Sequence, residues 1–225
     1  MKRLLAAAIA AALLLSGCTS ASRPAESAPP TEMPSPSPTP VVTPTPEPEP
    51  ADDEFVLVRD YIPGIFIDLK YATTDNFTGQ VIYDSDEAYL RYGTVKKLLC
   101  AQNELSGRGL SLKIWDAYRP VSAQFKLWEI CPNPVYVSDP NNGYSKHSRA
   151  NTVDITLVTD TGKSIPMPSG FDDFTSLADR DYSDVSDEAA ENARLLENVM
   201  VENGFVPYSG EWWHYSDSVA YDVYG

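Results

Sequence analysis

Alternating apolar and polar residues mark two strands in the middle of the chain. In residues 110–115 every second residue is Leu or Ile, and in residues 152–157 every second residue is Val, Ile or Leu. A period of two is that of a strand with one face against the core, so Asp154 should point to the opposite, polar face. Residues 65–69 are rich in β-branched and aromatic side chains and predict a third strand.

Helical spacing appears in three other stretches. Apolar residues recur at near-helical spacing in residues 86–105, and a short helix should follow Pro120. A last helix should occupy residues 186–204, with a serine as N-cap and a glycine at its end. Strand-like segments at 205–208 and 212–216 finish the chain. Strands and helices mixed without a regular βαβ rhythm predict an α+β fold with a mainly antiparallel central sheet flanked by helices.

The N-terminal residues differ in character from the rest of the chain. Residues 1–17 contain an apolar run that is too short to span a bilayer and ends just before Cys18. This pattern predicts a lipoprotein signal peptide, with Cys18 lipidated and the protein anchored outside the cytoplasm on the bacterial cell membrane. The alternative is an ordinary secretory signal with a chance cysteine. Residues 18–53 are proline-rich and predict a disordered tether, which leaves residues 54–225 as one compact domain.

The net charge restricts the kinds of binding partner, and the cysteines raise the possibility of a disulfide. The formal net charge of −15 argues against binding to nucleic acid. Besides Cys18 the chain has Cys100 and Cys131. In an oxidising compartment these two would be able to form a disulfide, and the alternative is two separately buried thiols.

The two histidines of the chain, His147 and His214, each lie near a carboxylate. His147 is seven residues before Asp154, and His214 is three residues after Glu211. Two imidazoles and one carboxylate bind zinc and leave a fourth position for water, which is typical of a catalytic site. Residues three apart on an ideal strand point to opposite faces. Glu211 must therefore lie in the turn after Gly210 or at a bulge if it is to meet the same site.

Several motifs stand in order along the chain: Lys70 to Gly79, Trp115 to Pro120, His147-x6-Asp154 and Glu211-Trp212-Trp213-His214-Tyr215. Together they resemble one known family, the VanX-type D-alanyl-D-alanine dipeptidases. The resemblance covers nearly the whole domain and implies a zinc D,D-peptidase (hedgehog/DD-peptidase-like) fold.

The resemblance implies a role for several residues. One Zn²⁺ per chain would be held by His147, Asp154 and His214, with Glu211 as the catalytic acid and base. Arg119 matches the arginine that stabilises the tetrahedral intermediate.

Other matching positions concern the substrate. By the same resemblance Tyr71, Ser145 and Asp172 contact the substrate, with Asp172 and Tyr71 near its free amine. The family usually has a glycine where this chain has Ala150, so alanine must adopt ordinary backbone angles there or tolerate strain. Trp212 or Trp213 would help to close the pocket.

The resemblance implies zinc-dependent hydrolysis of the D-Ala-D-Ala dipeptide derived from peptidoglycan. The first alternative is a D,D-carboxypeptidase that trims the terminal D-Ala from cell-wall peptides. The second is a non-catalytic wall-binding module with a structural metal. Glu211 argues against the second alternative, since a structural site has no need of a base beside it.

Overall fold

The structure is a computed structural model and describes residues 48–224. The strands are β1 (Phe55–Leu57), β2 (Phe66–Ile67), β3 (Tyr89–Arg91), β4 (Leu110–Asp116), β5 (Thr152–Thr159), β6 (Phe205–Tyr208) and β7 (Glu211–Asp217). The α-helices are α1 (Val58–Tyr61), α2 (Tyr92–Ser106), α3 (Val121–Ile130) and α4 (Asp187–Glu202), and there are short 3-10 helices at η1 (Lys70–Ala72), η2 (Lys146–Arg149) and η3 (Ser176–Ala178). The α+β class is therefore confirmed.

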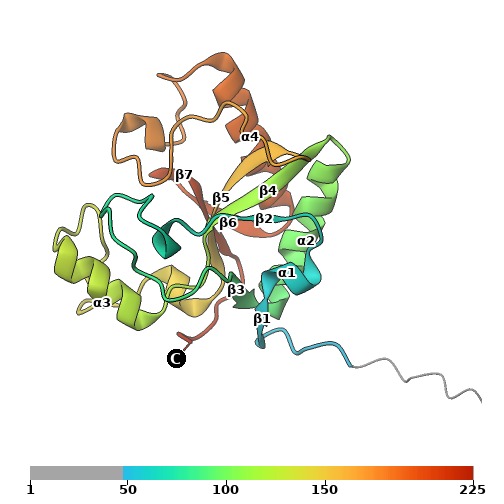
Figure 1. Cartoon of the computed structure of the whole chain (residues 1–225). Coiled ribbons are helices and arrows are strands. Elements are labelled where there is room, and N and C mark those ends of the chain that lie inside the picture. Colours follow the sequence, from blue (N-terminus) through green and yellow to red (C-terminus); the bar gives the residue numbers. More distant parts are fainter. Residues whose placement is uncertain (1–47, 225) are drawn as a thin grey trace, which may run out of the picture. The chain divides into compact units, whose positions relative to one another are not determined.

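A five-stranded sheet in the order β2-β4-β5-β7-β6 runs through the centre of the described residues (Figure 1). β2 pairs with β4 in parallel, and the other three pairings of this sheet are antiparallel. The sheet is thus mixed, with the parallel pair at one edge. β1 and β3 form a separate antiparallel pair.

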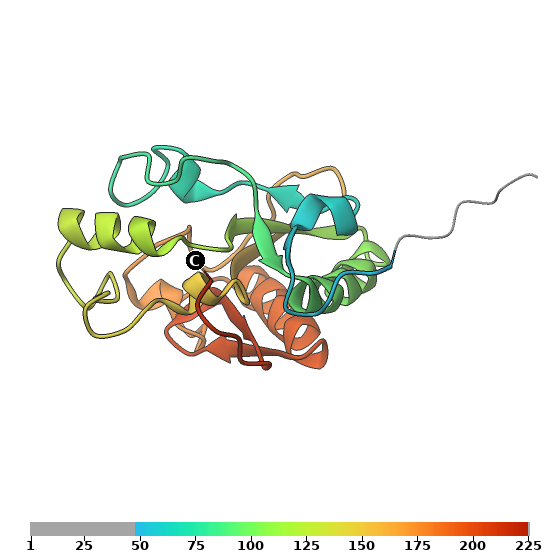
Figure 2. The ribbon, with the colours of Figure 1, turned by 90° about the horizontal axis from the view of Figure 1, so that it is seen from below.

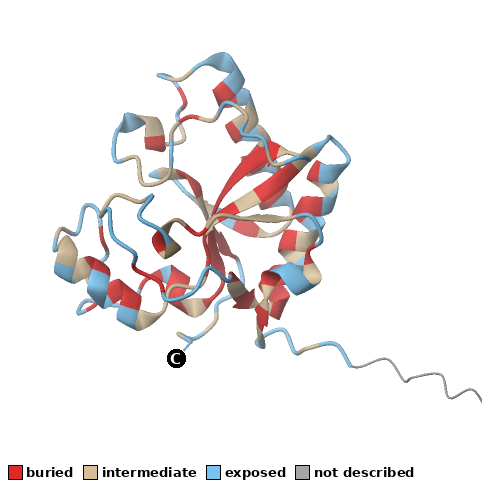
Figure 3. Ribbon diagram, in the orientation of Figure 1, coloured by how far each residue is buried: buried red, intermediate tan, exposed pale blue. Residues whose placement is uncertain are grey.

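Two long helices cover one face of the sheet. Figure 2 shows α2 and α4 side by side on the same side of the strands, while α3 lies at the far end of the molecule. The inward side chains of β5, Val153, Ile155 and Leu157, face this helical layer and are buried in the main core. The predicted alternation in β5 is therefore correct. The opposite side chains are also buried, because loops cover the second face of the sheet (Figure 3).

Helix α4 forms as its sequence predicts. The Ser186 hydroxyl accepts a hydrogen bond from the Ala189 backbone N–H, and Asp187 and Glu188 lie at the positive end of the helix dipole. Gly204 follows with a positive φ of 88°, which suits glycine after a helix end. The buried face of α4 consists of Ala189, Ala190, Ala193, Leu196, Val199 and Met200.

Long-range pairing changes two predicted elements. The helix expected over residues 86–105 begins only at Tyr92, because residues 89–91 pair with β1 as strand β3. The strand expected over residues 65–69 is reduced to two residues, and the chain turns into η1 directly afterwards. In both places tertiary partners overrode a local preference.

Ala150 has a strained backbone conformation. It has φ 59° and ψ 30°, in the left-handed region, and ends η2, the 3-10 helix that carries His147. An L-residue in this region costs roughly 1 kcal/mol. The backbone N–H of Ala150 donates to the His147 carbonyl and its own carbonyl accepts from Arg91, so neighbouring segments hold the strained residue in place.

The cysteines after residue 47 form no disulfide. Cys100 is exposed and Cys131 is half-buried, and both are free. Neither alternative for the pair holds, since the thiols are neither joined nor both buried. The predicted signal peptide 1–17, the lipidated Cys18 and nearly all of the tether 18–53 lie outside the described residues. Within residues 48–224 no helix is long and apolar enough to cross a membrane.

Candidate active site

Three side chains from distant parts of the sequence converge at one point. One ligand atom from each of His147, Asp154 and His214 lies within 4.8 Å of the other two. His147 Nε2 is 3.4 Å from Asp154 Oδ2, and His214 Nδ1 is 2.9 Å from Asp154 Oδ1. Burial alone would raise the pKa of Asp154, but the facing imidazole of His147 lowers it below its ordinary value. The carboxylate is therefore ionised and suited to bind a cation.

Strand register brings Asp154 and His214 together. They are direct partners in the antiparallel pairing of β5 with β7. Side chains of such partners lie on the same face of a sheet, with Cβ atoms about 5 Å apart. The two ligands therefore need no further adjustment of the backbone to meet.

His147 reaches the same point from a loop. Ser145 caps η2 by accepting a hydrogen bond from the His147 backbone N–H. The His147 ring nitrogen Nδ1 lies 2.8 Å from the carbonyl oxygen of Ala117. A carbonyl can only accept, so Nδ1 carries a proton, and Nε2 is the ring nitrogen that lies on the side of Asp154.

Glu211 lies beside the three proposed metal ligands, in the kind of position that the sequence predicted. It is the first residue of β7, after the turn at 209–210, and the register of β6 with β7 shifts between Pro207 and Tyr208. This irregularity leaves Glu211 Oε2 3.4 Å from His214 Nδ1. Burial, followed by the negative charge of Asp154, raises the pKa of Glu211 above its ordinary value. A carboxyl group with a raised pKa is suited to accept and return a proton near neutral pH.

Arg119 is a half-buried cation that hydrogen bonds hold in place, and not a surface side chain. Its Nη2 donates to Asp116 Oδ2 at 2.6 Å, and its Nη1 donates to Gln124 Oε1 at 2.9 Å. Asp116 is fully buried, and its second oxygen accepts from the hydroxyl of Tyr83. Arg119 also lies over the ring of Tyr71, 5.0 Å from its centroid. The sequence analysis missed the supporting residues Asp116, Gln124 and Tyr83, although Asp116 stands within the Trp-Asp-Ala-Tyr-Arg-Pro motif.

Tyr71 and Asp172 meet across 101 residues of sequence. The Tyr71 hydroxyl donates to Asp172 Oδ2 at 2.8 Å. Burial raises the pKa of Asp172 to about 8, helped by the charge of Asp154 and opposed by the Tyr71 hydrogen bond and Arg119. Asp172 also has a positive φ of 53°, a conformation that Asp tolerates better than most residues. The structure thus brings these two predicted site residues together, and their role is taken up below.

A hollow of about 320 Å³ opens beside the metal group. Ser145, Glu211 and His214 contribute to its lining. Ser145 therefore borders the space available to a substrate, in addition to capping η2.

The two tryptophans of β7 do not close this hollow. Trp212 and Trp213 are almost fully buried, and Trp212 Nε1 donates to the Ser169 hydroxyl. A row of half-exposed aromatic rings that the sequence analysis missed lies nearer the surface. The ring of Phe174 packs against Phe77 at 5.4 Å and against Tyr136 at 4.6 Å between centroids, and thereby ties three loops together.

An α+β fold with a His/Asp/His group beside a half-buried carboxylate is typical of a metal-dependent hydrolase. Comparison with known proteins supports this class. A family model described as D-ala-D-ala dipeptidase, of the M15 peptidases, matches residues 51–222. The chain belongs to this peptidase family and is a metallopeptidase of the dipeptidase type.

Curated relatives share most of their length with the chain. A D-alanyl-D-alanine dipeptidase of Escherichia coli is 38% identical, with 72% of this chain and 83% of the relative covered. One of Enterococcus faecium is 34% identical, with 72% of this chain and 90% of the relative covered. A solved structure of VanYB in complex with D-alanine-D-alanine has a TM-score of 0.41 and 16% identity, covering 69% of this chain and 86% of that one.

The comparisons correct one expectation. The chain was expected to be a membrane-attached lipoprotein with a signal peptide. The matched relatives are named as dipeptidases, and none of the names describes a lipoprotein or a membrane protein. The prediction of a lipoprotein signal and lipid anchor was therefore wrong. Its premise was a short apolar segment ending in cysteine, which is a local sequence pattern.

The geometry predicts that Asp154 is needed for metal binding. Asp154→Ala should lower the affinity for zinc on the order of 100-fold or more, since even residues that only orient a ligand contribute 10- to 100-fold. Titration against a competing chelator measures this change. Asp160→Ala is the matched control, because this exposed carboxylate follows the same strand and should leave the affinity unchanged. Equal affinities of the two variants would contradict the assignment.

Proposed function

We propose that this chain hydrolyses the D-Ala-D-Ala dipeptide with one zinc ion held by His147, Asp154 and His214. The observation that carries the proposal is the convergence of these three side chains next to Glu211. Two imidazoles and one carboxylate suit zinc better than the harder cations. When bound, zinc polarises the peptide carbonyl and makes an adjacent water more acidic.

Glu211 is the proton carrier in this proposal. A water molecule beside the metal group gives its proton to the Glu211 carboxylate as its oxygen attacks the peptide carbon. Glu211 then returns the proton to the leaving amine. The raised pKa of Glu211 supports this role, because the proton must be held and then released near neutral pH.

Arg119 stabilises the oxyanion that develops on the peptide carbonyl. Its guanidinium stays charged at any working pH. Asp116 and Gln124 fix it on one side, so little reorientation is needed when the negative charge develops. Asp116 neutralises part of the guanidinium charge, and the remaining positive potential faces the substrate.

Asp172 binds the ammonium group of the dipeptide, with Tyr71 holding the carboxylate in position. Ser145 borders the substrate on the side of Glu211. The catalytic domain in this proposal comprises residues 54–225 and has the zinc D,D-peptidase (hedgehog/DD-peptidase-like) fold.

The row Phe77, Phe174 and Tyr136 favours a dipeptide over the longer peptides that a D,D-carboxypeptidase would trim. The rings join the loops that surround the site and leave less room for a chain extended beyond two residues. Substrate length is therefore the feature that separates the two candidate activities.

The length limit predicts a difference between substrates. The zinc-loaded protein should cleave D-Ala-D-Ala and leave a stem pentapeptide ending in D-Ala-D-Ala intact. Phe174→Ala should add cleavage of the tripeptide D-Ala-D-Ala-D-Ala, because the row is interrupted. Released D-Ala measures each reaction. Phe125→Ala, an exposed aromatic of α3, is the control and should keep the dipeptide limit. Cleavage of the pentapeptide alone by the wild type would favour the carboxypeptidase.

Replacing Glu211, the proposed proton carrier, should lower the rate of catalysis without loss of bound metal. Glu211→Gln should lower kcat by roughly 10²- to 10⁴-fold, the usual contribution of a positioned acid and base. The zinc content measured by atomic absorption should stay at one per chain. The control Glu202→Gln changes an exposed carboxylate at the end of α4 and should leave kcat unaltered. Undiminished turnover in Glu211→Gln would refute the role of Glu211.

The pKa of Asp172 predicts a pH-dependent KM. Only the ionised carboxylate attracts the substrate ammonium, and burial raises the pKa of Asp172 to about 8. KM should therefore fall as the pH rises from about 6 toward 8, with the range moved to lower pH by the charge of a nearby metal ion. Asp172→Asn should give a higher KM that no longer varies over this range. Asp173→Asn, its neighbour, should behave like wild type; a persistent slope in Asp172→Asn would exclude this carboxylate.

A further inference from the structure

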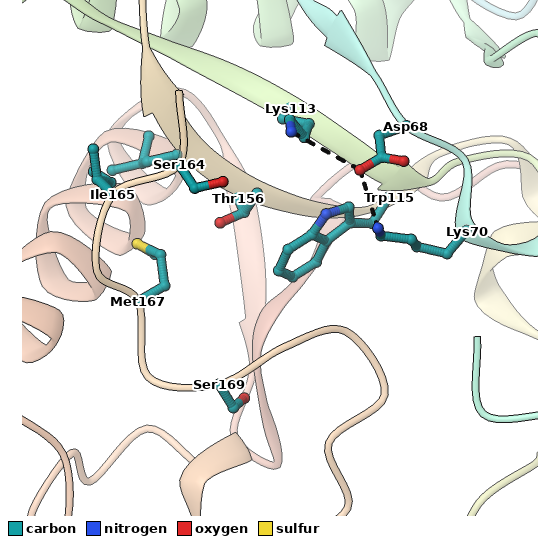
Figure 4. Close-up of a pocket in the computed structure, with 10 residues that line it drawn as sticks. Asp68, Lys70, Lys113, Trp115, Thr156, Ser164, Ile165, Met167 and Ser169 are labelled. Carbon is teal, nitrogen blue, oxygen red and sulfur yellow. Dashed lines mark ion pairs between the residues drawn. The ribbon is translucent and has the colours of Figure 1, made fainter. Parts of the chain in front are cut away.

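A second hollow lies on the same face of the sheet as the metal group. It has a volume of about 320 Å³ (Figure 4). Its floor is formed by Lys113 of β4 and Thr156 of β5, which are partners in the antiparallel register. Figure 4 shows the segment with Ser164, Ile165 and Met167 on one side, and Asp68 with Lys70 on the other.

This hollow is separate from the proposed catalytic site. Thr156 and Asp154 are two residues apart on β5 and therefore point to the same face. An aromatic partition lies between the two places: Trp115 packs edge-on against Trp212 at 5.6 Å and at a tilt against Phe171 at 5.8 Å between centroids. The proposed metal ligands, Glu211 and Arg119 are absent from the lining of the hollow.

The hollow has hydrogen-bond donors that lack partners among the described residues. Thr156 is 5% exposed, and its hydroxyl makes no hydrogen bond within residues 48–224. The hydroxyl of Ser164 also makes none there. Among the described residues the fully buried side-chain polar atom without a partner is Ser148 Oγ, so the hydroxyls of Thr156 and Ser164 are accessible from the hollow and can bond a ligand.

The cation of the hollow that can bind a ligand is Lys113, because the Lys70 ammonium is already paired with Asp75 at 2.6 Å and with Asp68. Lys70 and Lys113 both line it, and Asp68 is the one acidic residue in the lining. Asp68 lies 3.1 Å from the Lys70 ammonium and 3.9 Å from that of Lys113, so the Lys113 contact is too long for a hydrogen bond. The Lys113 ammonium therefore retains donors for another partner.

Part of the remaining lining is apolar, although Ser169 also contributes to it. The ring of Trp115 and the side chains of Ile165 and Met167 face the hollow. A ligand that matches both parts has an anionic end for Lys113 and Thr156 and a short hydrocarbon body for the aromatic and aliphatic wall. A volume of this size fits a small molecule and not a polymer chain.

We infer that this hollow is a binding site for a small aliphatic carboxylate. The carboxylate accepts hydrogen bonds from the Lys113 ammonium and the Thr156 hydroxyl, and its alkyl part packs on Trp115. An ammonium–carboxylate hydrogen bond in a half-buried site is among the stronger polar contacts. This inference does not depend on the proposed hydrolysis, because it concerns residues on the other side of the aromatic partition.

Titration with sodium propionate tests the site. Quenching of tryptophan fluorescence, to which Trp115 contributes, should saturate in the wild type. Lys113→Met should raise the dissociation constant about tenfold, as expected for loss of one charged hydrogen bond. Lys113→Arg should largely preserve binding. Lys163→Met is the control: this exposed lysine lies close in sequence but outside the lining, and its loss should have no effect.

Two further variants make the result unambiguous. Thr156→Val keeps the shape of the side chain and should weaken propionate binding severalfold. This variant serves as the test if Lys113→Met proves unstable. Asp154→Ala should bind propionate as well as wild type, because the metal group is not used. Loss of binding in Asp154→Ala would place propionate at the metal centre and overturn the inference, as would equal effects of Lys113→Met and Lys163→Met. Stronger binding of inorganic phosphate than of propionate would overturn the carboxylate assignment.

Discussion

The site depends on one register between two strands. Asp154 and His214 are direct partners of β5 and β7, so a single backbone pairing fixes two of the three proposed ligands on one face. A slip of one residue would turn Asp154 toward the core, because side chains alternate along a strand. Val153 and Tyr215 are also partners and are fully buried on the core side. The hydrophobic core thus enforces the register that the metal group requires.

The face of the sheet that carries the metal group also carries several acidic side chains. Removing these side chains from water opposes folding. Asp116, Asp154 and Glu211 are taken out of most of their contact with water, and burial of a carboxylate costs several kcal/mol unless it is paired. Arg119 pairs with Asp116, and the imidazoles pair with Asp154. For Glu211, 3.4 Å from His214, and for Asp172 the effect of burial prevails over the nearby cations, and their pKa values are raised. A metal cation and the ammonium of a substrate would relieve this excess of negative charge, which relates the electrostatics of the fold to its chemistry.

Aromatic side chains divide the polar face into compartments. Trp115 and Trp212 separate the metal group from the hollow at Lys113, and Phe77, Phe174 and Tyr136 cross the loops around the active site. Rigid rings suit both positions, because they exclude water over a large area with few rotatable bonds. The buried tryptophans of the Glu-Trp-Trp-His motif therefore form an internal wall, and the loops supply the covering that the motif was expected to give.

The sequence by itself determined the features that depend on neighbouring residues. The period of β4 and β5, the capped helix α4 and the spacing of His147, Asp154, Glu211 and His214 all follow from local patterns and recognisable motifs. Only the tertiary structure decided which distant segments meet. Pairing of β1 with β3, the left-handed Ala150 and the contacts around Arg119 and Phe174 join residues far apart in the chain. Such contacts leave no periodic signal, because their free energy arises from burial that exists only once the chain has folded.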